Sequence, residues 1–575
     1  MPIKLLFTLI FVVNLSVFAG QNQDLLSISQ QQDWQKLMHD HQILDKKFYI
    51  TQNNKSSVLV ELQANIERLQ KDSYYSCQFP ARAKYLSSKL NIQYSECSAV
   101  TDWKRSVSGE TLSLVFVSQY VSNPASAFGH TFLLFRNKDK PLNFNVVISN
   151  AANIPDDVTD FEYIWKGLVG GFPAEFSNDY LYLKLQEYSN IENRDMWIYD
   201  LNFSKDEIDQ VLNHIWEISR QTTQGYRFLN QNCAVNTYDV IAAVHPKLNF
   251  YPPSIYVLPV ETVVKVFPIT KDYEYIPSLR EKIYLRTQKL QKQETEEFQK
   301  IISNISRENF ISTKNPDVAE LALEYYEFLR VRQDGKLSSI QNVNHQKSLI
   351  NRAEIQQVAQ TMDIPSPKPP HQASPPVRAT FGSYVEQNQQ YYFMSISPFY
   401  HSLLSKSEGY LPFSEFILLD FSIKKSIDYE YIDLALFRTA NFPSTTIFDT
   451  QLSWLARVEL TSDLFCKNCW SIGTDLGLGK SIELLSQSRL FALAGLYQNP
   501  NVDLSPQILL GSLFESHNNN LMTQLRVLKE ESKNNLNLVY ELGLSHSFNS
   551  QIQLEFFTSI ENDRSSYQFS LGYGF

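Results

Sequence analysis

The chain has 575 residues, of which 43% are hydrophobic and 19% charged, and its formal net charge is −10. This length is too great for a single hydrophobic core, so three or more folded units are expected. The acidic balance, without any stripe of Lys and Arg, excludes nucleic acid as a partner, because phosphate binding needs clustered positive charge.

The N-terminus predicts an exported protein. Lys4 precedes an apolar run from Leu5 to Phe18, and Val17 and Ala19 are small residues at the −3 and −1 positions of a cleavage site. The run is too short for a transmembrane anchor, and no later run is long and apolar enough for a spanning helix. Residues 1–19 are therefore interpreted as a secretory signal peptide, and the absence of a cysteine at the cleavage point argues against a lipid-anchored precursor.

Two regions of different periodicity follow the signal peptide. Residues 20–110 place apolar side chains at helical spacing and are expected to form an N-terminal helical region. From Thr111 short strand-like runs alternate with helical ones, so residues 111–265 are expected to form an α+β domain. The predicted strands are 112–118, 131–136, 143–149 and 196–199, and the main predicted helix is 205–220.

The five cysteines single out one thiol. In an oxidising compartment Cys77 could pair with Cys97, and Cys466 with Cys469 across a turn. Cys466-Lys-Asn-Cys469 could instead be a redox motif, although nothing around it predicts a thioredoxin-like unit. If both pairs form, Cys233 is left as a free thiol in an exported protein.

The second half of the chain predicts a membrane barrel. Residues 266–345 are expected to be helical, and the Pro-rich region 346–378 is interpreted as an extended spacer. From 379 to 575 apolar and aromatic residues alternate with small or polar ones, as in Tyr567 to Phe575, which ends the chain on an aromatic residue. A soluble sandwich is the alternative. The signal peptide and the aromatic-rich strands favour an outer-membrane β-barrel of about 12 antiparallel strands.

Cys233 lies where a loop is predicted to turn into a helix. Asn230 and Asn232 are candidate N-cap residues, and the positive end of a helix dipole favours thiolate over thiol. A thiolate nucleophile needs a base. Among the ten histidines, His130 stands apart because it follows a glycine at a loop-to-strand junction. A purely structural histidine is the alternative interpretation.

The order of these residues, with His on a strand before a Cys that opens a helix, resembles the circularly permuted branch of the papain-like superfamily, with NlpC/P60-like Cys–His domains. Over roughly residues 70 to 265 the chain further resembles the Lnb N-terminal periplasmic domain family. The elements that carry this resemblance are Cys77-Gln-Phe-Pro-Ala-Arg82, Phe128-Gly-His-Thr131, Lys166-Gly-Leu-Val-Gly-Gly-Phe172, Asn193-Arg-Asp-Met-Trp-Ile-Tyr199 and Asn232-Cys233.

A member of that family is understood as a lipoprotein N-acyltransferase that uses a Cys and a His. The resemblance therefore implies thioester chemistry on a phospholipid or lipoprotein, with Cys233 as nucleophile, His130 as base and no metal or cofactor. Asn150 is our choice for a third, orienting residue, with Ser149 and Asn145 as alternatives, although Asn150 could be a plain turn residue. The expected protein is a periplasm-facing acyltransferase of the outer membrane. A cysteine hydrolase (peptidoglycan amidase, peptidase or phospholipase) and a non-catalytic outer-membrane protein remain open.

Overall fold

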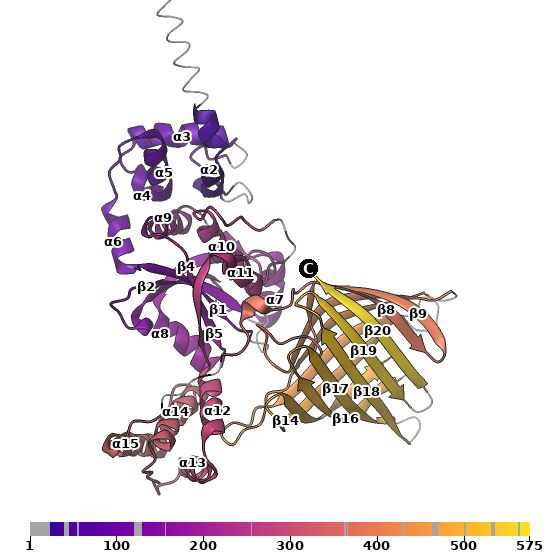
Figure 1. Ribbon diagram of the computed structural model, residues 1–575. Coiled ribbons are helices and arrows are strands. Elements are labelled where there is room, and N and C mark those ends of the chain that lie inside the picture. Colours follow the sequence, from indigo (N-terminus) through magenta and orange to yellow (C-terminus); the bar gives the residue numbers. More distant parts are fainter. Residues whose placement is uncertain are drawn as a thin grey trace, which may run out of the picture. The chain divides into compact units, whose positions relative to one another are not determined.

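The computed structural model divides into two compact units, Met1–Ile276 and Pro277–Phe575, which are described separately (Figure 1). The predicted signal peptide and the Cys466–Cys469 pair lie outside the described residues. In the part of the chain that the structure describes, no helix is long and apolar enough to cross a bilayer. The described residues are 24–39, 45–53, 57–107, 109–119, 129–155, 157–222, 224–252, 254, 256–360, 364, 366–427, 430–462, 470–499, 502–530, 535–561 and 564–575.

The first unit opens with short helices around their own small core, as predicted. Trp34, Leu62 and Leu86 are completely buried in this core. A disulfide joins Cys77 to Cys97, which confirms the predicted pair. The elements are α2 (Gln32–Leu37), η1 (Lys46–Phe48), α3 (Val58–Lys71), α4 (Tyr75–Gln78), α5 (Pro80–Leu90) and α6 (Ser98–Val107).

Arg82, from the first motif of the family resemblance, ties these helices to the rest of the unit. Its guanidinium is completely buried between the rings of Phe48 and Phe79, at 4.2 and 4.3 Å from their centroids. Its Nε lies 3.6 Å from the equally buried carboxylate of Glu217 on α9 (Lys205–Gln221). Removing one partner of a buried ion pair leaves an uncompensated charge and strongly destabilises the folded protein. Arg82 therefore stabilises the folded unit.

A seven-stranded antiparallel sheet forms the core of the first unit, in the order β6-β4-β3-β2-β1-β5-β7. The four predicted strands are present. Residues 270–276 were expected to be helical but pair with β5 instead, so the α+β unit extends to Ile276. The strands are β1 (Thr111–Val117), β2 (His130–Arg136), β3 (Val146–Ala152), β4 (Phe172–Tyr180), β5 (Met196–Leu201), β6 (Gln224–Tyr226) and β7 (Thr270–Ile276).

The sheet has different partners on its two faces. On one face Phe132, Val147 and Met196 form a buried cluster with Tyr188, from the π-helical turn η3 (Leu185–Ile191). On the other face Asn150 of β3 contacts α10, because successive strand residues point to opposite faces. The remaining helices of the unit are α7 (Asp160–Val169), α8 (Leu181–Lys184), α10 (Cys233–Ala242) and α11 (Pro259–Val266).

The second unit begins with four helices that pack around Ile283, Phe298 and Leu321. Asp449, in the connection between two barrel strands, is completely buried and pairs with Arg280 and Arg332 of these helices. The helices are therefore fastened to the barrel. They are α12 (Leu279–Lys289), α13 (Lys292–Asn304), α14 (Pro316–Arg332) and α15 (Ser339–Glu354).

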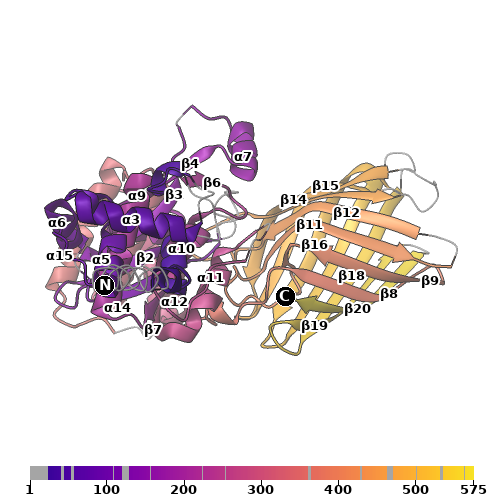
Figure 2. The same ribbon diagram turned by 90° about the horizontal axis from the view of Figure 1, so that it is seen from above.

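A closed antiparallel barrel of twelve strands completes the chain, which confirms the predicted barrel and strand number (Figures 1 and 2). It closes where β8 pairs with β20 and where β9 pairs with β11. The short β10 (Phe399–His401) also pairs with β11. The barrel strands are β8 (Arg378–Glu386), β9 (Gln389–Ser397), β11 (Ser414–Lys425), β12 (Glu430–Asn441), β13 (Ser453–Ser462), β14 (Trp470–Glu483), β15 (Ser488–Asn499), β16 (Val502–Glu515), β17 (Asn519–Glu530), β18 (Asn535–Ser547), β19 (Ile552–Glu561) and β20 (Arg564–Gly574).

The two faces of the barrel have opposite chemistry. Leu478 and Phe569 are among the many large apolar side chains that point outward and stay exposed. Inside, Arg526 pairs with Asp475 at 2.8 Å and bonds Gln507. An apolar outer band around a polar interior is the pattern of an outer-membrane barrel, and a soluble sandwich would show the reverse.

One end of the barrel interior is filled by the segment between β10 and β11, residues 402–413, which we call the plug. Leu403 and Leu404 lie within a buried apolar cluster formed by inward-pointing side chains of the wall. The carbonyl of Leu404 accepts a hydrogen bond from Ser545 Oγ at 2.7 Å, and that of Ser405 accepts one from Asn520 Nδ2 at 2.6 Å. The plug thus crosses the lumen and is fixed to the wall on its far side.

The Pro-rich segment differs from the prediction. It was interpreted as an extended spacer over residues 346–378, but residues 346–354 belong to α15. Pro370 and Ala373 are buried against Gly409 of the plug, and the carbonyl of Ser374 accepts a hydrogen bond from the Tyr410 hydroxyl at 3.3 Å. The segment therefore packs onto the barrel. Proline lacks a backbone N–H but keeps its carbonyl, and the segment contacts the barrel through backbone carbonyls such as that of Ser374.

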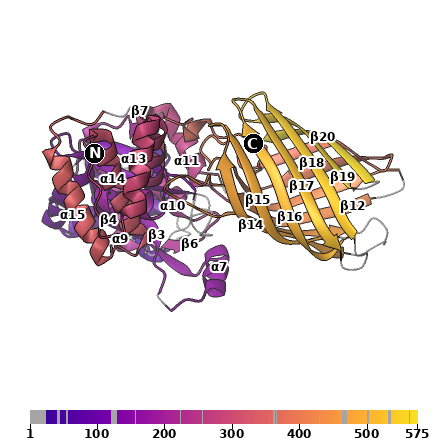
Figure 3. The same ribbon diagram turned by 90° about the horizontal axis from the view of Figure 1, so that it is seen from below.

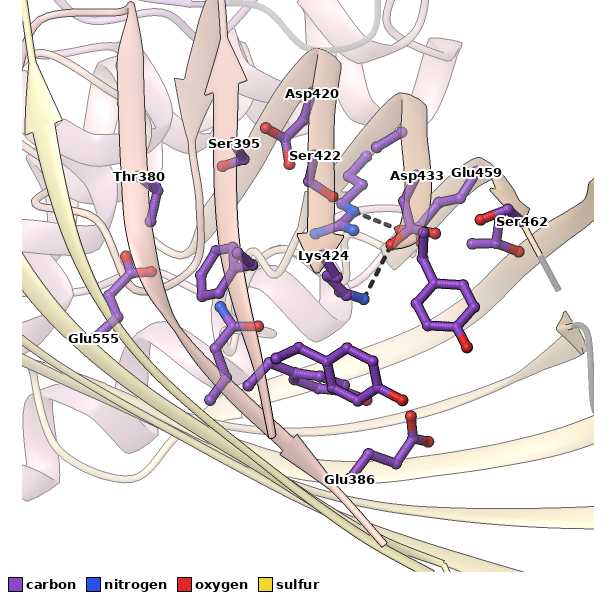
Figure 4. A pocket seen from close by; sticks show the side chains of 18 of the residues that line it. Thr380, Glu386, Ser395, Asp420, Ser422, Lys424, Asp433, Glu459, Ser462 and Glu555 are labelled. Carbon is purple, nitrogen blue, oxygen red and sulfur yellow. Dashed lines mark hydrogen bonds and ion pairs between the residues drawn. The ribbon is translucent and has the colours of Figure 1, made fainter. Parts of the chain in front are cut away.

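The interior beyond the plug contains a polar cavity of about 270 Å³, shown in Figure 4. Lys424 pairs with Asp433, and Arg438 with Glu459, across its wall. Most of its charges are thus neutralised by neighbours.

Candidate functional site

Cys233 is the first residue of α10, as the sequence predicted. Asn232, not Asn230, is the N-cap: its Oδ1 accepts hydrogen bonds from the backbone of Ala234 at 3.0 Å and of Val235 at 3.3 Å. The Asn232 amide also donates to the carbonyls of Phe228 and Val257. One side chain therefore starts the helix and holds the preceding loop. The thiol is unpaired and 3% exposed.

Burial controls the ionisation of the thiol. It raises the pKa of Cys233, while hydrogen bonds from the backbone of Thr131 and the hydroxyl of Tyr226, and the charge of Arg194, act in the opposite direction. The helix start was expected to favour the thiolate, but the pKa of Cys233 is raised overall. Desolvation of the thiolate outweighs the hydrogen-bond donors around it. The resting group is a thiol.

His130 is the first residue of β2 and is partly buried. Its ring packs against Phe132 and Tyr188, with centroids at 6.2 and 5.6 Å. Burial lowers the pKa of His130 to about 3, with the charges of Arg194 and Lys184 acting in the same direction. The imidazole is therefore neutral at physiological pH, and its buried Nε2 has no hydrogen-bond partner among the residues that the structure describes.

The thiol and the imidazole lie at the same end of the sheet, the thiol on α10 over one face and the imidazole against Tyr188 of η3 over the other. The backbone of Thr131, next to His130, bonds the thiol, and Tyr188 lies against the His130 ring and within electrostatic reach of Cys233. Within the described residues no hydrogen bond joins the two side chains directly. Catalytic hydrogen bonds are often long in unliganded enzymes and tighten when substrate binds, so this arrangement fits a dyad at rest.

The three candidates for an orienting residue lie elsewhere. Asn150 is completely buried, and its Oδ1 accepts a hydrogen bond from Asn236 on α10 at 2.8 Å. Ser149 contacts Ser177, and Asn145 caps a turn through the backbone of Asn137. In the described residues none of the three contacts His130. Asn150 fixes the helix that carries Cys233.

Sequence reasoning missed three residues at this site. The Tyr226 hydroxyl accepts a hydrogen bond from the backbone N–H of Cys233 at 3.3 Å. Tyr188 separates His130 from Arg194, whose guanidinium lies 5.1 Å from the Tyr188 ring. Arg194 is 1% exposed and donates to the carbonyl of Ser118. Arg194 lies in one of the motifs that carry the family resemblance, but its contact with Ser118 joins residues 76 positions apart, which the sequence pattern does not reveal.

The glycine-rich motif of the family resemblance, residues 166–172, spans the end of α7 and borders the Cys233 loop. Gly170 has φ +91°, a conformation that favours glycine, and a Cβ there would lie 2.8 Å from Nε of Arg227. An open cavity of about 340 Å³ lies between this motif and Gln231. The motif therefore approaches the segment that carries the thiol.

Comparison with protein families gives three matches along the chain. Residues 99–268 match the Lnb N-terminal periplasmic domain. Residues 26–89 and 367–575 match two domains of unknown function, DUF7843 and DUF7840. The last match begins within the Pro-rich segment, in agreement with its packing on the barrel. Among curated proteins no relative was found.

Solved barrel structures share only low similarity with the chain. The KdgM porin is 11% identical, with a TM-score of 0.24, over 35% of this chain and 99% of its own. A mutant of the Rh. blastica porin is 6% identical, with a TM-score of 0.18, over 35% and 98%. The beta domain of the Bordetella autotransporter BrkA is 12% identical, with a TM-score of 0.20, over 35% and 100%.

Proposed function

Because the chain carries an Lnb N-terminal periplasmic domain and ends in a closed outer-membrane barrel, it is an outer-membrane protein that faces the periplasm, and we propose that it is a cysteine acyltransferase. Its substrates would be phospholipids or lipoproteins, and the acyl group would pass through a thioester on Cys233. The observation that carries this proposal is the buried free thiol beside a neutral imidazole whose Nε2 lacks a partner.

In the proposed first half-reaction, His130 takes the proton of the Cys233 thiol as sulfur attacks the carbonyl carbon of an acyl ester. The S–C bond forms, the ester C–O bond breaks, and His130 returns the proton to the leaving alkoxide. The raised pKa of Cys233 and the lowered pKa of His130 both disfavour a separated thiolate–imidazolium pair. Proton transfer is therefore expected to accompany attack.

Tyr226 supplies the proposed stabilisation of the oxyanion. Its hydroxyl contacts both the backbone N–H and the thiol of Cys233. When the substrate carbonyl oxygen enters, it can accept hydrogen bonds from the backbone N–H of Cys233 and from the Tyr226 hydroxyl, once that hydroxyl turns towards it. In the second half-reaction an amine attacks the thioester, the C–N bond forms, the C–S bond breaks, and the amine proton returns to sulfur through His130.

Burial of the thiol favours transfer over hydrolysis. With Cys233 at 3% exposure, bulk water has little access to a thioester, whereas an amine held by a bound substrate would be positioned to attack it. Exclusion of water from a reactive intermediate is a general role of closed active sites.

Trapping tests the proposal. The purified full-length protein is incubated with phospholipid labelled in its acyl chain, and Cys233 is examined by mass spectrometry for a hydroxylamine-sensitive adduct. Wild type should carry the acyl group, and Cys233→Ala should carry none. Asn145→Ala, whose turn lies away from the site, is the matched control. No adduct from lipid in wild type would refute the lipid-acyl mechanism, and an adduct only from peptidoglycan fragments would support the hydrolase.

A further inference from the structure

Helix α7 exposes an apolar face at the active-site end of the first unit. Trp165, Leu168 and Val169 are 58, 42 and 48% exposed. Their spacing of three and four residues places them on one side of the helix. Figures 2 and 3 show α7 standing out from the body of its unit. Single exposed apolar residues are ordinary, but a group of three that includes a tryptophan indicates an interaction surface.

The opposite side of α7 packs on the loop that carries the thiol. The Tyr163 ring lies 5.2 Å from that of Phe228, and at Gly167 the Phe228 ring leaves no room for a Cβ. The backbone N–H of Phe228 donates to the carbonyl of Gly167 at 2.7 Å. Phe228 in turn accepts a hydrogen bond from Asn232, the cap next to Cys233. A short chain of contacts thus connects α7 to the nucleophile.

The topology also places α7 near the site. The helix lies between the end of β3 and the start of β4, and β2 begins with His130 at this same end of the antiparallel sheet. Whatever covers the apolar face therefore lies at the same end of the sheet as His130.

We propose that the apolar face of α7 docks on the periplasmic leaflet of the outer membrane and delivers phospholipid to the Cys233 site. Tryptophan prefers the membrane–water interface. Lys166 beside it is paired with Glu162 at 2.5 Å, so docking rests on the apolar side chains and not on attraction to anionic headgroups. A three-residue patch is far smaller than the roughly 800 Å² per partner of a stable protein interface. It suffices for a membrane, because the barrel anchor makes the second contact intramolecular.

Docking of α7 on the membrane is independent of the proposed acyl transfer. Only the identity of the delivered substrate rests on the proposed function. The contacts through Phe228 further suggest that docking shifts the loop and opens the buried thiol to lipid. The protein would then acylate Cys233 from vesicles and leave dispersed single lipid molecules largely unused.

Fluorescence quenching tests the docking. The full chain, with Trp454→Phe and Trp470→Phe to remove barrel tryptophans, is reconstituted in phosphatidylethanolamine/phosphatidylglycerol vesicles containing brominated phospholipid. A quenched component should be present, should disappear with Trp165→Phe, and should persist with Cys233→Ser.

The matched control for this measurement is Tyr182→Trp in the Trp165→Phe background, because Tyr182 is an exposed aromatic at the other end of the sheet. The tryptophan introduced there should not be quenched. Equal quenching with and without Trp165 would overturn the proposal. Quenching of the Tyr182→Trp variant to the same extent as Trp165 would also overturn it.

Photo-crosslinking in intact cells provides a second measurement that leaves the barrel tryptophans in place. A photoreactive amino acid at Leu168 should yield phospholipid adducts, and one at Tyr182 should yield none. Protein adducts alone at Leu168 would overturn the proposal in favour of a protein partner. Lipid adducts without any Cys233 thioester would support docking while refuting the acyltransferase.

Discussion

The Tyr226 hydroxyl accepts a hydrogen bond from the backbone N–H of Cys233, at 3.3 Å. This N–H is the donor that a developing oxyanion beside the nucleophile would use. The hydroxyl thus occupies, in the resting site, the place where the substrate oxygen is expected, and it can turn from acceptor to donor when that oxygen arrives.

Replacing Tyr226 by Phe should therefore slow acylation of Cys233 by about 10²-fold, the usual cost of one oxyanion donor, while leaving lipid binding nearly unchanged. Single-turnover acylation measures the rate. Tyr238→Phe is the matched control, since that hydroxyl bonds the carbonyl of Asn249 instead. Equal effects of the two substitutions would contradict the role of Tyr226.

The raised pKa of Cys233 predicts how the free thiol reacts. Because thiolate is the reactive form, alkylation by a small neutral reagent should accelerate with each pH unit up to and beyond pH 9, without a plateau. Peptide mapping after timed iodoacetamide treatment gives the rate at Cys233. A plateau between pH 6 and 8 would indicate a thiolate–imidazolium pair at rest and would contradict the neutral dyad.

His130 predicts a loss of stability in acid. Its pKa is about 3 in the folded protein and near 6.5 when unfolded. Between these values the unfolded chain binds the extra proton, so the free energy of unfolding should fall as pH decreases from about 6.5 towards 3. His130→Gln should show a shallower pH dependence in chemical denaturation of the detergent-solubilised protein. Parallel curves for the two proteins would disprove a depressed pKa.

The buried Asp449 predicts a large cost of removal. Asp449→Ala leaves Arg280 and Arg332 without their shared carboxylate, and loss of one partner of a buried pair typically costs about 3 kcal/mol or more. Earlier thermal unfolding of the helices is expected, with barrel migration on gels unchanged. Glu327→Ala removes a partly exposed pair with Arg330 and should cost less than about 1 kcal/mol. Similar losses in both variants would argue against the anchoring role.

The plug predicts that the barrel conducts no ions. Leu403 and Leu404 close one end of the lumen with apolar side chains, so the wild-type protein should be electrically silent in planar bilayers. Replacing residues 403–409 by a short Gly-Ser segment should open steps of conductance if the wall still closes. Steady conductance of wild type would show that the plug leaves a path.

Local pattern predicted much of this architecture. Period-two alternation specified the barrel because lipid outside and polar groups inside select every second residue. Asn232 and Cys233 were placed correctly, since N-cap chemistry acts over three residues. Cys77 and Cys97 paired as their spacing allowed.

The failures were long-range. Residues 270–276 form a strand because they pair with β5. The helical patterns on either side of them gave no sign of this strand. The net pKa of Cys233 depended on burial by distant elements, and the contacts of Tyr226 and Arg194 depended on tertiary folding. The hydrogen bond from Asn236 to Asn150 joins two separate elements, and the neighbours of Asn150 in the sequence do not reveal it.

The pairing of β8 with β20 also fixes an order of assembly. The first barrel strand finds its last neighbour only when the final residues of the chain are available. Export from the N-terminus therefore brings the residues before Arg378, where β8 begins, into the periplasm while the ring is still open. The Cys77–Cys97 disulfide lies entirely within this earlier part of the chain, so its formation needs no barrel strand.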